Sequence, residues 1–189
     1  KQDSVPDAWN MLKDQGETGK PIWDVIDTPT TNCLRGGREG LIEPLDLSKI
    51  PNAEKMPAAY RTPYSVAYEF YSSVLAYNTK ALKKVPQSWA DFWNVKDFPG
   101  TRALRNDPMG TLEAALLSDG VPRDKLYPLD VDRAYKRLKQ IKPDIAVWWS
   151  SGGQSAQLLS DGEVDMLMMW NGRVGAVHKE KPEMDFTYN

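Results

Sequence analysis

This chain has very little cysteine and histidine, two residues that often act in catalysis and metal binding. Its 189 residues include one cysteine, Cys33, and one histidine, His178, which lies in a stretch rich in lysine and glutamate. A single cysteine excludes an internal disulfide, although it decides little about the cellular compartment. A single histidine argues against a histidine-rich metal site and against most histidine-based catalytic triads.

An excess of one charge and a long apolar run are missing as well. The formal net charge is −2, so the sequence has no basic footprint for nucleic acid, and we expect no nucleic-acid partner. No apolar run approaches the roughly 20 residues that span a membrane, so we expect no direct membrane insertion. The 41% hydrophobic and 26% charged residues form a balance typical of a globular protein.

The hydrophobic pattern predicts an α/β fold. In the first part of the chain it indicates helices over 5–15 and 32–39, a short strand over 22–26 and an extended segment over 63–78. In the second part it indicates strands over 101–106, 145–149 and 164–170, with helices over 112–118, 131–141, 154–160 and 172–179. Strands that alternate with helices imply a parallel or mixed sheet covered on both faces.

Residues 148–173 contain the most informative pattern, because two strands in this stretch each end in a polar turn that opens a helix. The first turn contains Ser150, Ser151 and Gln154, where exposed backbone N–H groups and serine hydroxyls suit a negative charge or a carbonyl oxygen. Simple capping of the helix by a serine is the alternative, and it stays open. In open α/β sheets, ligands bind at the edge where such strands end.

The second turn begins at Trp170 and continues through Asn171, a glycine and Arg173. An arginine side chain presents a planar fork that suits a carboxylate or a phosphate. The alternative is a surface arginine on the first helical turn. That alternative is disfavoured because the positive end of a helix is a poor place for an unpaired cation.

Two further segments are candidates for a site. The turn over 107–111 contains Thr111 at another strand-to-helix junction, where simple capping again explains the hydroxyl. The aromatic segment over 68–71 belongs mostly in a core, although one of its side chains, such as Tyr71, can face a cleft at a break in the alternation.

No catalytic constellation is visible. The sequence contains no nucleophile elbow, no cysteine–histidine pairing and no metal-ligand spacing, so we expect neither an enzyme nor a cofactor. A glycosidase with Asp107 and Glu113 as its two carboxylates is a competing hypothesis, because such enzymes need only two carboxyl groups about 5–10 Å apart. An interaction module that docks through its tryptophans is another.

Three groups of segments resemble a known family. They are Trp23–Ile26 with Glu39–Asp46; Ser73–Asn78 with Pro86–Trp93 and Phe98–Gly100; and Ser160–Asp165 with Trp170–Gly172. In their order and spacing they resemble the extracellular solute-binding proteins of bacterial ABC importers, in the branch of the spermidine/putrescine receptors.

The resemblance implies a type II periplasmic-binding-protein fold, with two lobes and a double crossover. Residues 1–80 would belong to lobe one, 81–184 to lobe two and 185–189 to the start of the return crossover. Because the opening strands and the completion of lobe one are not in this sequence, and its start resembles neither an initiator nor a signal peptide, we expect an incomplete lobe one and a processed or partial chain.

The resemblance also implies a receptor that closes on a small solute between its lobes and then docks on the permease of an ABC importer. Its location would be periplasmic, or extracellular and membrane-tethered in a Gram-positive host, with the signal peptide removed. Carried onto this sequence, the ligand contacts would be Thr28, Thr30, Tyr71, Thr111, Ser150, Ser151, Gln154, Trp170, Asn171 and Arg173.

One departure from the family pattern concerns the solute. Polyamine receptors place an acidic residue three positions after the strand-end tryptophan, where this chain has Arg173, and they have acidic side chains near the turn over 109–111. An arginine facing a polyamine is unfavourable because like charges repel strongly in a low dielectric. We therefore expect a solute with a carboxylate or another anionic group, and a polyamine is the alternative.

Overall fold

The computed structural model describes residues 5–188, so the expectations for residues 1–4 and 189 lie outside it. The chain divides into two compact units, residues 1–70 and 71–189. Strand β3 (Ser73–Asn78) pairs with strands from the end of the chain, β6 and β7, and so belongs to the second unit. The lobe boundary expected at residue 80 stays a prediction.

The first unit contains two helices and little sheet. Its α1 (Val5–Thr18) and α2 (Thr30–Arg38) match the two helices expected there. Two-residue strands, β1 (Arg61–Thr62) and β2 (Ser65–Val66), pair antiparallel with each other. The connections contain the short 3-10 helices η1 (Leu47–Lys49), η2 (Ala53–Lys55) and η3 (Ala58–Tyr60).

The strand expected over 22–26 does not form. Its first two backbone N–H groups, at Ile22 and Trp23, donate instead to Gln15 Oε1 at 2.7 and 3.1 Å. Within residues 5–188 no other strand pairs with this segment, and Ile22 and Val25 are 69% and 89% exposed. Its apolar residues thus satisfied the sequence pattern for a strand without having a partner strand.

The second unit is built on a five-stranded mixed sheet in the order β5-β4-β6-β3-β7. Strand β4 (Arg102–Arg105) runs parallel to β5 (Ile145–Trp149) and to β6 (Met166–Trp170). Strand β3 is antiparallel to β6 and to β7 (Met184–Thr187). The expected α/β class with a mixed sheet is confirmed. The extended segment expected over 63–78 is in fact interrupted, with only β2 and β3 forming strands.

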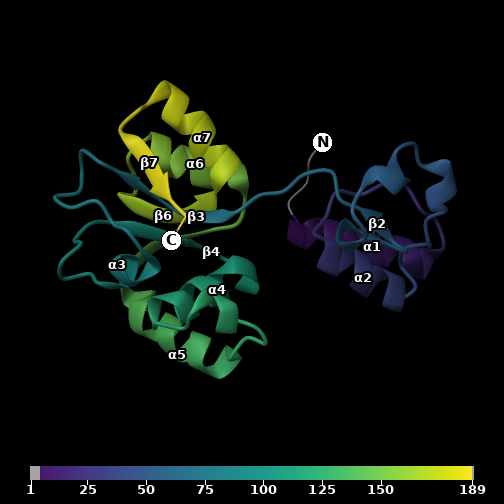
Figure 1. Ribbon diagram of the computed structural model, residues 1–189, viewed down its shortest axis with the longest axis horizontal. Coiled ribbons are helices and arrows are strands. Elements are labelled where there is room, and N and C mark those ends of the chain that lie inside the picture. Colours follow the sequence, from purple (N-terminus) through teal and green to yellow (C-terminus); the bar gives the residue numbers. More distant parts are fainter. Residues whose placement is uncertain (1–4, 189) are drawn as a thin grey trace. The chain divides into compact units, whose positions relative to one another are not determined.

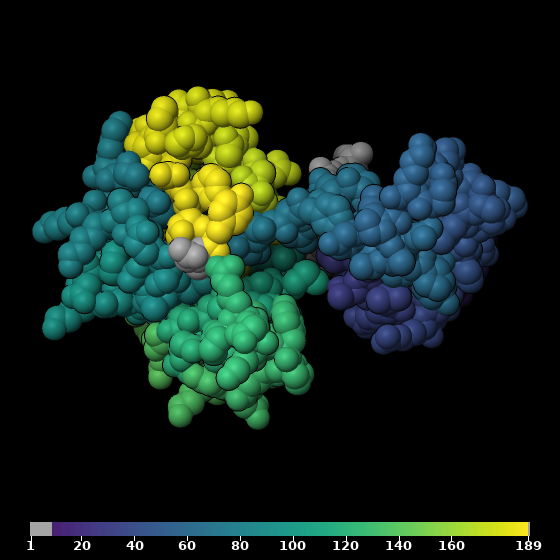
Figure 2. Space-filling view, viewed as in Figure 1, coloured from purple at the N-terminus to yellow at the C-terminus, as the bar shows by residue number. Residues whose placement is uncertain are grey.

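Helices cover both faces of this sheet, as expected. Figure 1 shows α6 (Gly152–Ser160) and α7 (Asn171–Glu180) on one side, with α4 (Pro108–Ser118) and α5 (Val131–Ile141) on the other. Figure 2 shows the same two helical layers in a space-filling view, with α4 and α5 in green and α6 and α7 in yellow-green to yellow. A short α3 (Trp89–Trp93) and the 3-10 helices η4 (Arg123–Lys125) and η5 (Lys142–Asp144) complete the unit. The central strands β3, β4 and β6 are almost entirely buried between these layers.

The sheet brings three strand ends to one edge. Because β4, β5 and β6 are parallel, their last residues, Arg105, Trp149 and Trp170, lie at the same edge. The antiparallel β3 begins there, since Ser73 pairs with Trp170. Helices α4, α6 and α7 follow these three strands, so their N-termini open at this edge.

Candidate functional site

Trp170 is the centre of this edge. Its ring makes edge-to-face contacts with Trp149 and with Tyr71, both at 5.7 Å between ring centroids. Trp149 is fully buried and donates its indole N–H to Met168 O at 2.9 Å, so it is a fixed support. Tyr71 is 47% exposed, which leaves an aromatic surface open beside Trp170.

Gly152 and Arg173 meet at the edge of the Trp170 ring. A Cβ atom built on Gly152 would lie 2.6 Å from Trp170 Cζ3 and 3.0 Å from Arg173 Nε. Only a glycine allows this approach, and it joins the start of α6 to the start of α7 through the tryptophan. The two turns singled out in the sequence are therefore neighbours in the fold.

The charges at these helix starts are not balanced. The first turns of α6 and α7 contain no acidic residue, and Arg173 is exposed. Among residues 5–188, no carboxylate forms an ion pair with Arg173. A cation beside two helix N-termini is repelled by their partial positive charges unless an anion lies among them.

The start of α4 has the opposite character, because its backbone N–H groups are already bonded to carboxylates. Asp107 Oδ1 accepts from the Met109 N–H at 2.8 Å, and Glu113 Oε2 accepts from the Gly110 N–H at 2.8 Å. The other Glu113 oxygen accepts from the Tyr127 hydroxyl at 2.8 Å. The edge thus has one helix start neutralised by carboxylates and two whose first turns contain no acidic residue.

Arg105 is a charged residue of this edge that the sequence analysis did not identify. It is only 6% exposed, and its guanidinium lies over the Trp170 ring with Cζ 5.3 Å from the centroid. A single 3.3 Å contact joins its Nη2 to Asp107 Oδ2. The available signal was a basic residue at the end of a buried strand. Gly152 belongs to the first turn singled out in the sequence, although not to the expected contacts, and it directly follows the helix-capping Ser151.

Several expected contact residues use their polar groups to shape the edge. Ser151 Oγ caps α6 by accepting from the Gln154 N–H at 3.2 Å, and Gln154 Oε1 accepts from the Ser150 N–H at 3.0 Å. Asn171 Oδ1 accepts from the Ser72 N–H at 3.0 Å and so fastens the start of α7 to the start of β3. Helix capping was the alternative to ligand binding for the two serines of this turn, and Ser151 does cap α6.

Of the remaining three expected contact residues, one is buried beneath this edge and two belong to the first unit. Thr111 is 3% exposed, and its hydroxyl donates inward to Arg105 O at 3.1 Å. Thr28 and Thr30 belong to the first unit, where the Thr28 hydroxyl accepts from Asn32 Nδ2 at 3.0 Å and Thr30 is the first residue of α2. The structure thus brings together seven of the expected residues at this edge, namely Tyr71, Ser150, Ser151, Gln154, Trp170, Asn171 and Arg173.

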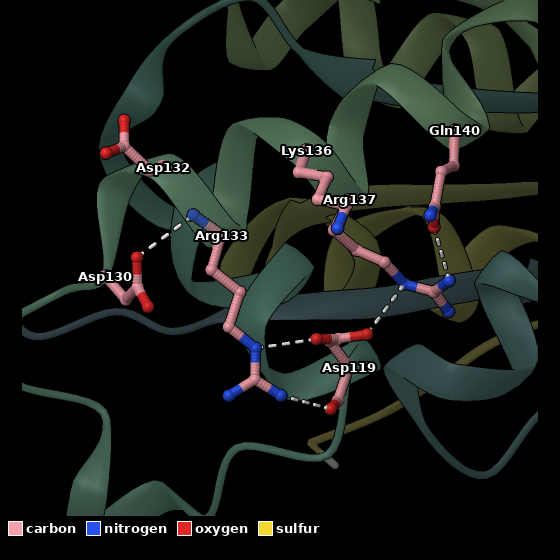
Figure 3. A pocket seen from close by; sticks show the side chains of 7 residues that line it. All are labelled: Asp119, Asp130, Asp132, Arg133, Lys136, Arg137 and Gln140. Carbon is pink, nitrogen blue, oxygen red and sulfur yellow. Dashed lines mark hydrogen bonds and ion pairs between the residues drawn. The ribbon is translucent and has the colours of Figure 1, made fainter.

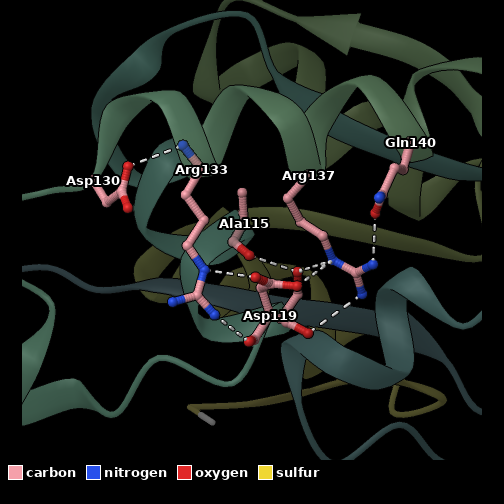
Figure 4. A network of polar contacts seen from close by, with 7 residues as sticks. Ala115, Asp119, Asp130, Arg133, Arg137 and Gln140 are labelled. Atoms are coloured by element: carbon pink, nitrogen blue, oxygen red, sulfur yellow. Dashed lines mark hydrogen bonds and ion pairs between the residues drawn. The ribbon is translucent and has the colours of Figure 1, made fainter.

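A surface hollow of about 520 Å³ lies away from this edge, between α4 and α5. Figure 3 shows its charged lining, and Figure 4 shows that much of this charge is internally paired. Asp119 Oδ2 accepts from Arg133 Nε at 2.6 Å, while Arg137 donates to Ser118 and Gln140. We interpret this network as a clamp between two helices.

Residues 5–188 contain no cluster of three or more histidine, cysteine, aspartate or glutamate side chains placed to hold a metal ion. None of the helices in this range has the length and apolar character needed to cross a bilayer.

The family model of the bacterial extracellular solute-binding proteins matches residues 1–189. The chain belongs to this family. The resemblance seen in the sequence is thereby confirmed, and the shared segments extend through both units of this solute-binding protein.

Similar proteins of known fold support the assignment. An ABC transporter substrate-binding protein from Bradyrhizobium japonicum is 69% identical, with a TM-score of 0.89 over 100% of this chain and 59% of the other. The PBP MotA from A. tumefaciens, solved in complex with glucopine, is 38% identical, with a TM-score of 0.88 over 96% of this chain and 58% of the other. The expected periplasmic-binding-protein fold is therefore confirmed.

A gamma-aminobutyric acid-binding protein of Pseudomonas aeruginosa is 42% identical to this solute-binding protein. The alignment covers 89% of this chain and 49% of the relative. The chain thus spans about half the length of the curated relatives that it matches.

Proposed function

We propose that this protein is the substrate-binding receptor of an ABC importer and that it captures a small solute bearing a carboxylate or another anionic group. The observation that carries the proposal is the meeting of Arg173 with the starts of α6 and α7 beside Trp170. Residues 71–184 supply the binding edge described above, as part of lobe two, and residues 1–70 contribute to lobe one.

The physical argument concerns unbalanced positive charge. Arg173 and two helix N-termini together favour an anion, because each contributes N–H donors and positive potential. The Arg173 fork suits the two oxygens of a carboxylate. Tyr71 and Trp170 offer aromatic surface for the apolar part of the same molecule.

The names of the relatives support an anionic solute. One relative is named for gamma-aminobutyric acid, which bears a carboxylate, and its identity to this chain is 42%. Proteins named for spermidine and putrescine are 29% identical or less. A polyamine remains the alternative ligand. Arg173, which has no ion pair among residues 5–188, argues against it, because a polyamine has only ammonium groups to offer to this cation, whereas gamma-aminobutyrate has a carboxylate besides its ammonium.

Membership of this family also supports a location outside the cytoplasm and a membrane permease as partner. We place the protein in the periplasm, or tethered at the outer surface of a Gram-positive cell. We further propose that it binds and releases its solute without chemistry. The matched relatives are solute-binding proteins, and Asp107 and Glu113, the carboxylates considered for a glycosidase, are engaged in capping α4.

A thermal-shift panel on the full chain tests this proposal. Small carboxylates, diamines and neutral sugars are each added at the same concentrations. We expect carboxylates to raise the Tm, since a ligand at about a thousand times its Kd stabilises by roughly 4 kcal/mol. A rise with diamines or sugars alone would contradict the proposal.

A further inference from the structure

Arg105 is buried behind Trp170, where its charge can act on a bound solute although its side chain is hardly exposed to solvent. We infer that Arg105 is a positioning residue that holds Trp170 in place and excludes cationic groups from the binding edge. The inference rests on the proposed function and concerns the selectivity of the same site. It comes from three features: the burial of Arg105, its stacking on Trp170 and its incomplete ion pair.

The backbone and the side chain of Arg105 are both fixed. The residue pairs with Trp149 in the β4–β5 ladder, and its carbonyl accepts from the Thr111 hydroxyl at 3.1 Å. The guanidinium lies 5.3 Å from the Trp170 centroid and 6.0 Å from that of Trp149. A buried cation stacked on two tryptophans contributes a favourable cation–π contact and restricts the movement of Trp170.

Trp170 depends on such support because its own polar group gives it no anchor. Its indole N–H is buried and has no hydrogen-bond partner within the described structure. The ring is therefore held by packing contacts alone: Arg105 lies over it, Trp149 and Tyr71 make edge-to-face contacts with it, and Gly152 lies against its Cζ3–Cε3 edge.

The charge of Arg105 is only partly neutralised. Its single contact with Asp107, at 3.3 Å, is neither bidentate nor short, and the Asp107 carboxylate also caps α4. Positive potential therefore remains behind Trp170, in a site of low dielectric where charges act strongly. A solute ammonium that approached this face of the tryptophan would meet a position already occupied by a cation.

The preference of the site for anionic over cationic groups therefore depends on both arginines, Arg173 and Arg105. Arg173 attracts an anionic group at the exposed side of the edge, while Arg105 repels a cationic group from the buried side. Gamma-aminobutyrate and putrescine are matched probes, because they have the same chain length and differ at one end, carboxylate against ammonium. The ratio of their affinities measures the preference.

Four variants of the full chain test the inference by titration calorimetry with these two probes. We expect Arg105→Met to lower the gamma-aminobutyrate-to-putrescine affinity ratio about tenfold or more, as removal of a nearby like charge would do. Arg105→Lys keeps the charge and should retain most of the ratio. Asp107→Asn keeps a capping oxygen but frees the Arg105 charge, so it should raise the ratio.

Arg102→Met is the matched control. Arg102 is a second buried arginine of β4, 1% exposed and 5.5 Å from the Phe92 centroid, at the opposite edge of the sheet. Its loss should reduce stability and leave the ratio unchanged. An unchanged ratio in Arg105→Met, or an equal change in Arg102→Met, would overturn the inference.

A second measurement needs no ligand. The indole N–H resonance of Trp170 is assigned by its loss in Trp170→Phe, and we expect it to shift in Arg105→Met but not in Arg102→Met. If the wild-type chain binds neither probe, the proposed function fails, while this resonance still decides whether Arg105 positions Trp170. A resonance unmoved by Arg105→Met refutes the positioning role.

Discussion

Gly152 lies against the benzene edge of Trp170, so closely that a Cβ atom on the glycine would be 2.6 Å from Cζ3 and 2.9 Å from Cε3 of the ring. This contact joins the start of α6 to the end of β6. Trp149, Tyr71 and Arg105 also contact the ring, which is otherwise partly exposed. The shape of the candidate site therefore depends on a residue that offers no side chain to a ligand.

Gly152→Ala tests this dependence. The added methyl group must displace Trp170 or Arg173, and such overpacking costs about 1–3 kcal/mol. We expect solute binding to weaken about tenfold or more. The control is Gly153→Ala, since a Cβ atom there meets nothing within 4 Å and alanine favours a helix. Calorimetry that shows equal binding by both variants would contradict the role of Gly152.

The clamp between α4 and α5 should affect stability alone. Asp119 and Arg133 are 38% and 44% exposed, and exposed ion pairs contribute about 1 kcal/mol or less. We expect Asp119→Ala to lower the free energy of unfolding by this amount and to leave solute affinity unchanged. Lys136→Ala, which alters the same hollow without breaking a described ion pair, serves as the control. A large loss of affinity in Asp119→Ala would place the ligand here instead.

Tyr127 should make stability depend on pH in the alkaline range. Burial, followed by the hydrogen bond to Glu113 and its charge, raises the pKa of Tyr127 from 10.0 to about 12. Because the folded state favours the neutral phenol, the contribution to stability is complete below pH 10 and is lost as the pH rises towards 12.

The measurement is the Tm of wild type and Tyr127→Phe across this range. We expect the wild type to lose more stability between pH 10 and 12 than the variant does. The difference will be modest, since the residue is 68% exposed and solvent screens the interaction. Parallel curves for the two proteins would show that the hydroxyl is not held by Glu113.

Much of the second unit could be predicted from the sequence, because local signals and packing agree there. Ser88 and Asp130 are residues of a type that caps helices, and they cap α3 and α5, while β4, β5 and β6 follow the apolar runs. The segment over 22–26 failed because a strand needs a partner, and hydrophobic pattern alone does not supply one. The pairing of β3 with β6 was not visible either, because it joins residues about a hundred positions apart.

The sequence predicted the residues at the surface of the candidate site, but not the buried residues that hold them in place. Trp170 and Arg173 were visible as a strand end followed by a helix start, and the parallel strands brought that junction to the other turn. The sequence did not show that the Thr111 hydroxyl donates inward to Arg105 O, and its role as a ligand contact stays a prediction. Arg105 was missed because a charged residue in a strand indicates solvent exposure until the packing around it is known.

The central claim is that this edge selects an anionic group through Arg173. The most direct test is titration calorimetry of the full chain with gamma-aminobutyrate and putrescine, in wild type and in Arg173→Met. We predict tighter binding of gamma-aminobutyrate by the wild type and a loss of about tenfold or more in the variant, as expected for a charge-assisted contact. Tight binding of putrescine that Arg173→Met leaves unchanged or weakens would contradict the claim.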